Sequence, residues 1–192
     1  MSVKKLSKWG EMYRNRIGES YPAYCRQQYR PFLDAIRKEM RKAQFAIVRE
    51  EGCGIATITK ILAQDADLEK FDFYAFDVNP DQVQNAVANL AMLSAHVQVQ
   101  WMNILKDTHT PVDIIHSHGV LEHFPDEDID LILARQKADC PVLVHYVPLD
   151  GWETKSYGDE RLLPIDYWVD RFKPSEWFTF NDGKDAALIW RR

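Results

Sequence analysis

The stretch AIVREEGCGIATI, from Ala46 to Ile58, joins an apolar run to a loop of small residues and then to a second apolar run. The segment QFAIVRE, at 44–50, has the composition of a buried strand, and IATITKILAQ, at 55–64, has the apolar spacing of a helix. Glycine-containing turns between a strand and a helix often hold phosphate. Here Glu50 and Glu51 precede the turn and would repel an anion. We therefore expect either a plain tight turn or a ligand that is not an anion.

Strand and helix patterns alternate beyond this stretch. Further strands are predicted at 71–77, 97–101, 112–118 and 141–147, and helices at 80–93 and 126–138. The segments EWFTFND and DAALIWRR, around Asp182, Gly183 and Lys184, predict an antiparallel hairpin. The pattern favours an α/β fold, in which a mostly parallel seven-stranded sheet ends in that hairpin and has helices on both faces.

The helix predicted at 80–93 starts with Pro80, a residue suited to the first helical position. Its apolar residues Val83, Val87, Leu90 and Ala91 lie on one side at helical spacing. We therefore expect these four to form its buried face.

The composition is that of one globular domain spanning residues 1–192, with 46% hydrophobic and 28% charged residues. No apolar run approaches the roughly 18 residues that span a bilayer, and MSVKKLSKWG does not resemble a signal peptide. The three cysteines, Cys25, Cys53 and Cys140, are odd in number and widely spaced. We expect reduced thiols in a cytoplasmic protein, and no contact with a membrane.

The net charge of −5 is unevenly distributed. Residues 1–42 hold eleven Lys and Arg against four Asp and Glu, so the remainder carries −12. A basic segment can mark a nucleic-acid partner. However, RPFLDAIRKEMRKA, at 30–43, interleaves its basic residues with apolar ones at helical spacing. We therefore prefer an amphipathic helix, and expect residues 1–43 to form an N-terminal helical cap on a core at 44–192.

Asp77 ends the second predicted strand, beside the loop of the first. In an open parallel sheet, ligands bind beyond the carboxyl ends of the strands, and an acid at this place accepts hydrogen bonds from ribose hydroxyls. A dinucleotide fingerprint is incomplete because Thr57 stands where a third glycine belongs, and no Walker lysine follows. With two glutamates nearby, the residues favour a nucleoside that carries positive charge.

EEGCGIA, at 50–56, resembles the E-x-G-x-G-x-G loop of class I S-adenosylmethionine-dependent methyltransferases. Similar landmarks follow in order: FYAFDVNPDQVQNA at 73–86, VQVQWMNILKD at 97–107, DIIHSHGVLEHFPDEDIDLIL at 113–133 and GDERLLPIDYWVDRF at 158–172. The last two resemble the small-molecule branch of the family. The resemblance implies a Rossmann-like fold, S-adenosyl-L-methionine as the cofactor, and in-line methyl transfer to a small-molecule acceptor.

The resemblance also implies roles for single residues. Glu50 would orient the loop or meet the methionine ammonium, and Asp77 would take the ribose hydroxyls. Two residues depart from the family pattern. Ala56 replaces the third loop glycine, which is tolerable where φ is negative, and Asn103 replaces the acid that usually bonds the adenine amino group. The expected cofactor-binding residues are Glu50, Gly52, Gly54, Asp77, Val78, Asn103, Ile104, Ser117 and His118.

Methyl transfer from a sulfonium relies on positioning and exclusion of water, and needs a general base only if the acceptor must lose a proton first. His118 is the candidate catalytic base. Glu122 and His123 are expected to have structural roles in a turn, and the histidines and Glu122 lack the further spacing of a metal site. No metal is therefore predicted.

Aromatic residues flank the predicted core, and they either seal helices onto the sheet or form the acceptor pocket. They are Trp9, Tyr13, Tyr21, Tyr24 and Tyr29 before the sheet, and Trp152, Tyr157, Tyr167 and Trp168 after the fifth strand. Tyr13, Arg14 and Arg16 are candidates to reach the cofactor carboxylate. Other functions stay open: a cofactor-binding protein without catalysis, a nucleic-acid methyltransferase, and, less favoured, a nicotinamide oxidoreductase. The chain is also a possible homodimer.

Overall fold

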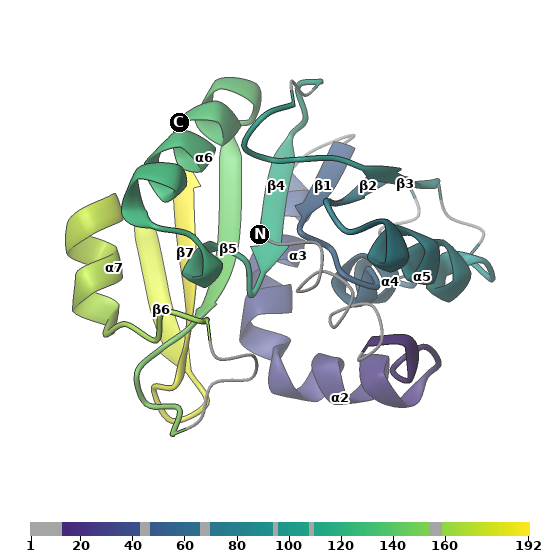
Figure 1. The fold of residues 1–192 in the computed structure, drawn as a ribbon, viewed down its shortest axis with the longest axis horizontal. Coiled ribbons are helices and arrows are strands. Elements are labelled where there is room, and N and C mark those ends of the chain that lie inside the picture. The colour runs from purple at the N-terminus through teal and green to yellow at the C-terminus, as the bar shows by residue number, and fades with distance from the viewer. Residues whose placement is uncertain (1–12, 43–46, 66–69, 94–95, 108–109, 154–158) are drawn as a thin grey trace.

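Seven strands form one sheet in the computed structural model, in the order β3-β2-β1-β4-β5-β7-β6 (Figure 1). The structure describes residues 13–42, 47–65, 70–93, 96–107, 110–153 and 159–192. The strands are β1 (Ile47–Glu51), β2 (Asp72–Asp77), β3 (Val97–Trp101), β4 (Ile114–His118), β5 (Val142–Pro148), β6 (Glu176–Phe180) and β7 (Asp185–Arg191). All adjacent pairs from β3 to β5 are parallel, whereas β7 runs antiparallel to both β5 and β6. The predicted mostly parallel sheet with a terminal hairpin is confirmed.

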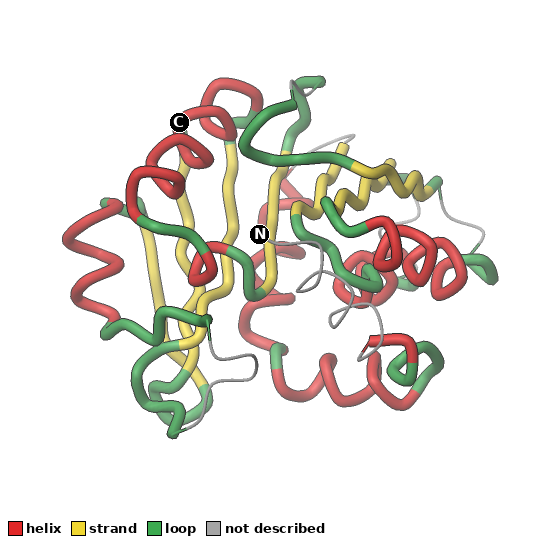
Figure 2. The backbone as a smooth tube through the Cα atoms, viewed as in Figure 1, coloured by secondary structure: helices red, strands yellow, loops and turns green. Residues whose placement is uncertain are grey.

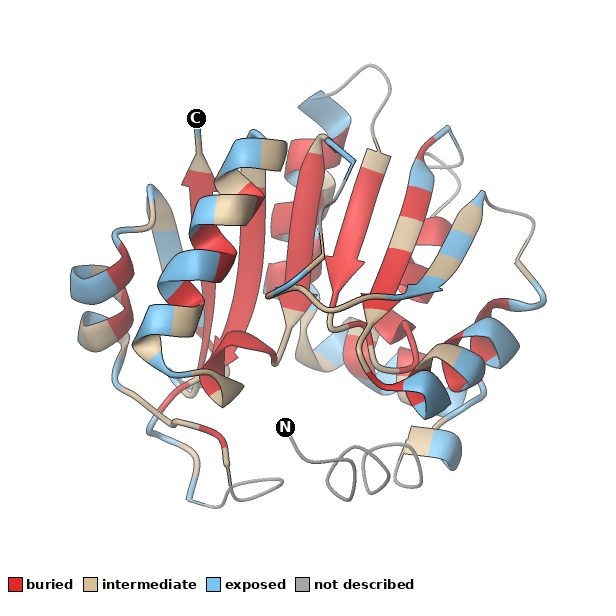
Figure 3. Cartoon of the chain, turned by 45° about the horizontal axis from the view of Figure 1, so that its top comes forward, coloured by how far each residue is buried: buried red, intermediate tan, exposed pale blue. Residues whose placement is uncertain are grey.

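Helices cover both faces of this sheet (Figure 2). They are α2 (Ser20–Gln28), α3 (Arg30–Lys42), α4 (Thr57–Ala63), α5 (Pro80–Leu90), α6 (Asp126–Asp139) and α7 (Ile165–Phe172), with a 3-10 turn, η2 (Leu121–His123), after β4. One core joins α2, α3 and α4 to one face, and another joins α6 and α7 to the opposite face. The central strands β1, β4, β5 and β7 are buried along most of their length, whereas the edge strands β3 and β6 are not (Figure 3).

The same strands contribute side chains to both cores, because side chains alternate between the two faces of the sheet. Ile114 of β4 and Val144 of β5 belong to the α2–α4 side, whereas the adjacent Ile115 and Leu143 belong to the α6–α7 side. Successive strand residues point to opposite faces, so a strand that is apolar at every position requires cover on both faces. The apolar runs of the sequence therefore explain the three-layer arrangement.

The two N-terminal helices have different positions. The predicted amphipathic helix is α3, which buries Phe32, Leu33, Ile36 and Met40 against the sheet. The preceding helix, α2, packs against α4, near the end of the sheet where β1 meets its loop. No helix among the described residues is both long and apolar enough to cross a bilayer.

The buried face of α5 differs from the prediction except at Leu90, which is buried as expected. Val87 is 53% exposed and Ala91 is exposed, whereas Gln82, Asn85 and Asn89 are buried. Asn89 donates its amide to the Ile55 carbonyl oxygen at 2.8 Å, and its side-chain oxygen accepts from Lys60. The helix is thus rotated toward polar groups of the neighbouring loop and helix, because hydrogen bonds there satisfy backbone groups that burial would leave unpaired.

The sheet order reverses at β1, which pairs with β2 on one side and β4 on the other. The helices that follow β1 and β4 leave the sheet on opposite faces. A crevice opens at such a switch point, beyond the carboxyl ends of the two strands. The loop after β1 and the turn after β4 therefore face each other across it.

Candidate cofactor and acceptor site

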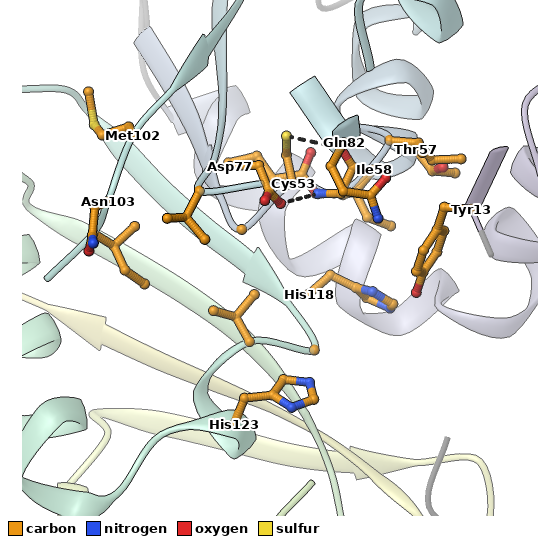
Figure 4. Close-up of a pocket in the computed structure, with 18 of the residues that line it drawn as sticks. Tyr13, Cys53, Thr57, Ile58, Asp77, Gln82, Met102, Asn103, His118 and His123 are labelled. Carbon is orange, nitrogen blue, oxygen red and sulfur yellow. Dashed lines mark hydrogen bonds between the residues drawn. The ribbon is translucent and has the colours of Figure 1, made fainter. Parts of the chain in front are cut away.

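A cavity of about 430 Å³ lies at this switch point (Figure 4). Its volume falls within the usual range of small-molecule sites. Eight of the nine predicted cofactor-binding residues line it, and Ser117 does not. The lining residues are Tyr13, Tyr21, Cys25, Glu50, Gly52, Cys53, Gly54, Ile55, Thr57, Ile58, Asp77, Val78, Gln82, Met102, Asn103, Ile104, Leu105, Lys106, His118, Gly119, Val120, His123 and Phe124.

The loop between β1 and α4 is built from left-handed backbone. Gly52, Gly54 and Ala56 have φ values of 68°, 54° and 55°. The expectation that Ala56 keeps a negative φ is therefore wrong: the third position has the same backbone requirement as the two glycines, at a cost of about 1 kcal/mol for a residue with a Cβ. The methyl group of Ala56 packs in a small core with Ala75 and Ala86, which offsets part of that cost.

The two glycines serve different purposes. A Cβ on Gly52 would lie 2.5 Å from Val120 Cγ2, so glycine here allows the loop to pack against the turn after β4. A Cβ on Gly54 would have only the side-chain nitrogen of Gln82 within 4.0 Å. Because Gly54 lines the cavity, its missing side chain leaves the backbone open to a ligand.

Asp77, at the end of β2, closes this loop onto the sheet. Its carboxylate accepts hydrogen bonds from the backbone nitrogens of Gly54 and Asn79, both at 2.8 Å. Burial raises the pKa of Asp77 to about 6 although these bonds favour the charged form. A carboxylate oxygen can accept two hydrogen bonds, so each oxygen of Asp77 can still accept one from a hydroxyl group in the cavity.

Glu50, at the end of β1, anchors the first turn of α4. Its Oε2 accepts from the backbone nitrogen of Thr59 at 3.0 Å and from the Thr59 hydroxyl at 2.6 Å. Burial, with a smaller contribution from the nearby charge of Asp77, raises the pKa of Glu50 to about 7. The two carboxyl groups thus make this end of the cavity favourable to a cation and unfavourable to phosphate.

The opposite end of the cavity is formed by the loop after β3. Asn103 lines it, and its side-chain oxygen already accepts from the backbone nitrogen of Leu105 at 3.0 Å. Asp107 accepts from the backbone nitrogen of Asn103 at 2.7 Å. Ile104 and Val78 add apolar surface. The amide oxygen of Asn103 therefore has one remaining lone pair for an adenine amino group.

Ser117 lies outside the cavity, because it is followed on β4 by His118 and adjacent strand residues face opposite ways. Ser117 is buried, and its hydroxyl lies 2.7 Å from His145 Nδ1. Gln136 bridges His145 Nε2 at 3.0 Å to Glu51 Oε2 at 2.8 Å. The predicted cofactor contact at Ser117 is thus replaced by a buried hydrogen-bond network beneath the sheet.

His118 lines the cavity inside an aromatic cage. Its ring stacks on Tyr146 with centroids 4.3 Å apart and meets Tyr29 edge-on at 4.1 Å. Burial lowers the pKa of His118 to about 3, so the ring is neutral at physiological pH. A base this weak holds a proton poorly in neutral solution. His118 is placed to contact a ligand, and its basicity argues against the predicted catalytic role.

Several lining residues were not predicted for this site. Cys25 comes from α2, and His123 from η2. Tyr13 and Tyr21, which also line the cavity, belong to the aromatic residues considered above for an acceptor pocket. Thr57, at the start of α4, lines the cavity with a buried hydroxyl that has no hydrogen-bond partner among the described residues. Gly119 also lines the cavity and has a φ of 71°. Its position directly after a predicted strand is the one local sign of this turn in the sequence.

Other predictions fall elsewhere. Arg16 donates a hydrogen bond to the hydroxyl of Tyr21 at 3.1 Å. Arg16 thus contacts a residue that lines the cavity. Trp9 and Tyr157 lie outside the described residues. Within the described ranges, no group of three His, Cys, Asp or Glu side chains is arranged to hold a metal ion.

The cavity fits the cofactor that the sequence resemblance implies. A carboxylate with spare accepting capacity suits ribose hydroxyls, the open space at Gly54 admits a ligand, and the unpartnered Thr57 hydroxyl offers a polar contact. Glu50 and Asp77 suit a group that is cationic at its amino-acid end. S-Adenosylmethionine, a nucleoside with a sulfonium and an ammonium, has these features.

Comparison with known proteins agrees with this assignment. Residues 48–138 match the family described as methyltransferase domain. Magnesium protoporphyrin IX methyltransferase from Synechocystis PCC 6803, solved with bound SAH, aligns with a TM-score of 0.66 and 12% identity, over 88% of this chain and 85% of that one. A search of curated protein sequences finds no match.

Two further structures align over a smaller part of their own length. The mitomycin 7-O-methyltransferase MmcR has a TM-score of 0.64 and 12% identity, over 77% of this chain and 49% of that one. The small RNA methyltransferase HEN1 has a TM-score of 0.70 and 13% identity, over 85% of this chain and 25% of that one. The chain thus spans about half of the former and a quarter of the latter, and at this identity the likeness concerns the fold. The family match over residues 48–138 and the shared fold show that this part of the chain is similar to class I methyltransferase domains, whose cofactor is S-adenosylmethionine.

Proposed function

We propose that the cavity beside Asp77 binds S-adenosylmethionine and that the chain transfers the methyl group of this cofactor to a small-molecule acceptor. The observation that carries the proposal is the pairing of Asp77 with the Gly54 backbone at the switch point of the sheet. The cofactor would supply an activated methyl group on a positively charged sulfur. The chain would contribute binding, orientation and exclusion of water.

Each end of the cavity has a separate task in this proposal. Asp77 would receive the ribose hydroxyls, and Asn103 with Ile104 would flank the adenine. Glu50, already fixed by Thr59, would face the positively charged end. Burial is the main cause of the raised pKa of Glu50, and a bound cation would stabilise the charged carboxylate against both burial and the repulsion from Asp77.

A small acceptor is favoured by the rest of the lining. Tyr13, Tyr21 and Phe124 give this cavity aromatic walls, and His118 adds a neutral ring. Basic side chains of the N-terminal helices form ion pairs with acids of the core domain, including Arg37 with Asp65 at 2.7 Å and Lys38 with Glu176 at 3.9 Å. These pairs support a basic segment that packs on an acidic domain over one that binds nucleic acid.

The test is calorimetric titration with S-adenosylmethionine and with S-adenosylhomocysteine. Asp77→Asn should weaken affinity at least about 100-fold, because two hydrogen bonds to a charged acceptor contribute roughly 1.5–3 kcal/mol each. Asp81→Ala, which removes an exposed carboxylate from the first turn of α5, is the matched control and should leave affinity unchanged. Wild-type affinity should also rise as pH increases through about 6, since the ionised carboxylate is the better acceptor. Equal affinity in wild type and Asp77→Asn would remove Asp77 from the site.

A further inference from the structure

His123 lies in the turn after β4 and lines the cavity on the same side as His118 (Figure 4). Its Nδ1 is 3.4 Å from Asp159 Oδ1, and its Nε2 is 3.9 Å from Glu122 Oε1. An imidazole that has a carboxylate at one nitrogen and a cavity beside it is the arrangement expected of an oriented general base. This contact lies within ion-pair distance but does not have hydrogen-bond geometry. Catalytic hydrogen bonds are often long or poorly aligned before substrate binds, so the contact is compatible with this role.

A clamp brings Asp159 to this position from a distant part of the chain. The backbone nitrogen of Arg161 donates to the Glu122 carbonyl oxygen at 2.9 Å. The Arg161 guanidinium donates to the Phe124 carbonyl oxygen and to Asp126, both at 2.6 Å. Three bonds from one residue therefore fix the segment that carries Asp159 against the turn that carries His123.

Glu122 is a different kind of neighbour. It is buried, and its Oε2 has no hydrogen-bond partner among the described residues. Burial, with smaller contributions from the nearby Glu160 and Asp159, raises the pKa of Glu122 to about 8, so this carboxyl group mostly carries a proton at neutral pH. A Cβ at position 119 would lie 3.2 Å from Glu122 Oε1, and this close contact explains why the position is occupied by glycine. Asp159, at 3.4 Å, is therefore the nearer carboxyl group to the imidazole, and Glu122 lies at 3.9 Å.

The two cavity histidines differ in their surroundings. His118 is enclosed by Tyr29 and Tyr146, whereas His123 faces the acidic groups of Glu122 and Asp159, with Glu160 and the basic Arg161 in the same segment. Carboxylates stabilise an imidazolium and aromatic enclosure does not. His123 thus has carboxyl groups beside its ring, whereas His118 is stacked among aromatic rings.

We propose that His123, positioned by Asp159, is the general base of this site and that the acceptor is a hydroxyl group on an aromatic ring. The inference rests on the proposed function. An imidazole base suits the acidity of a phenol-like hydroxyl, and Tyr13, Tyr21 and Phe124 suit its ring. In the balanced reaction, the O–H and S–CH₃ bonds break and the O–CH₃ bond forms. The sulfur keeps its electron pair, and the proton goes to His123 Nε2.

The first test needs no acceptor. Nitrogen-15 NMR of the full chain reports which ring nitrogen of His123 carries the proton when the imidazole is neutral. We expect the Nδ1–H form in wild type and a shift toward Nε2–H in Asp159→Ala. His96, which is exposed, provides the reference spectrum. An Nε2–H ring in wild type would overturn the proposal.

The second test compares 2-naphthol, 2-naphthalenethiol and 2-(aminomethyl)naphthalene, which share a ring system and differ in the acceptor atom. Release of S-adenosylhomocysteine is measured with each probe. His123→Asn should slow methylation of the naphthol about 100-fold or more, while affinity for S-adenosylmethionine stays unchanged. The thiol, which ionises more readily, should lose much less, and His96→Asn should match wild type.

The outcomes separate the two proposals. Methylation of the amine but not of the naphthol, or equal naphthol rates in wild type and His123→Asn, would overturn the role of His123. If no probe is methylated, the tautomer measurement decides. A wild-type protein that fails to bind S-adenosylmethionine contradicts the proposed function itself, whereas normal binding with an Nε2–H ring contradicts only the inference about His123.

Discussion

Replacement of Gly52 by alanine tests the contact between the loop after β1 and the turn after β4. The residue has a φ of 68°, which costs a residue with a Cβ about 1–2 kcal/mol. The new Cβ would lie 2.5 Å from Val120 Cγ2, and overpacking of this kind costs about 1–3 kcal/mol. We therefore expect Gly52→Ala to lower the free energy of unfolding by about 2–5 kcal/mol.

Gly54→Ala is the matched control, because it has a similar φ of 54° and an almost open environment. It should lose only about 1–2 kcal/mol of stability. Its methyl group would enter the cavity, so its main effect should be on cofactor affinity. Urea unfolding followed by circular dichroism measures the first quantity, and calorimetry measures the second.

A double-mutant cycle isolates the clash. Val120→Ala removes the atoms that the new methyl group would meet, so Gly52→Ala should cost about 1–3 kcal/mol less in that background. Equal losses of stability in Gly52→Ala and Gly54→Ala, together with additivity in the cycle, would refute the packing argument.

Ala56→Gly should leave the free energy of unfolding within about 0.5 kcal/mol of wild type, because relief of the left-handed backbone, about 1 kcal/mol, is offset by loss of a buried methyl, about 0.8 kcal/mol. Ala86→Gly, in the middle of α5, should instead cost about 2 kcal/mol, and a similar loss in both variants would contradict the assigned backbone. Glu122→Gln should become more stable relative to wild type as pH rises from about 5 to 8. Wild type loses free energy of unfolding over this window, because the raised pKa of Glu122 means that its carboxyl group is protonated in the folded state and ionised in the unfolded one. A difference in unfolding free energy between the two proteins that does not change with pH would rule this out. Gln136→Leu should cost about 1–3 kcal/mol by leaving His145 without a partner at Nε2, and chemical denaturation at one pH suffices to check it.

Local sequence patterns determined most of the fold. The apolar runs that became β1, β2 and β3 are short-range features, and each is bounded by turn residues that stop the strand. In the final hairpin, Asn181, Asp182 and Gly183 all have positive φ, which these residue types tolerate best. Such preferences depend on neighbours along the chain, so the sequence displays them directly.

Part of the site was also accessible from sequence. Asp77 and Gly54 meet because a parallel sheet places the ends of β1 and β2 at one edge, and this rule needs only the order of the elements. The rotation of α5 could not be predicted from the sequence. Asn89 is buried because it bonds Ile55 and Lys60, far away in sequence, and Val87 is exposed on the other side of the helix.

Tertiary structure alone decided the remaining features. Strand alternation separates Ser117 from His118, but only the position of β4 between two layers decides which of them faces the cavity. Ala56 adopts a left-handed conformation because the loop must close over Asp77. His123 acquires its carboxylate partner through the bonds of Arg161, across more than thirty residues of chain. Sequence thus determined the elements and their order, whose forces are local, whereas the packing of distant segments set the charge and orientation of the groups in the site.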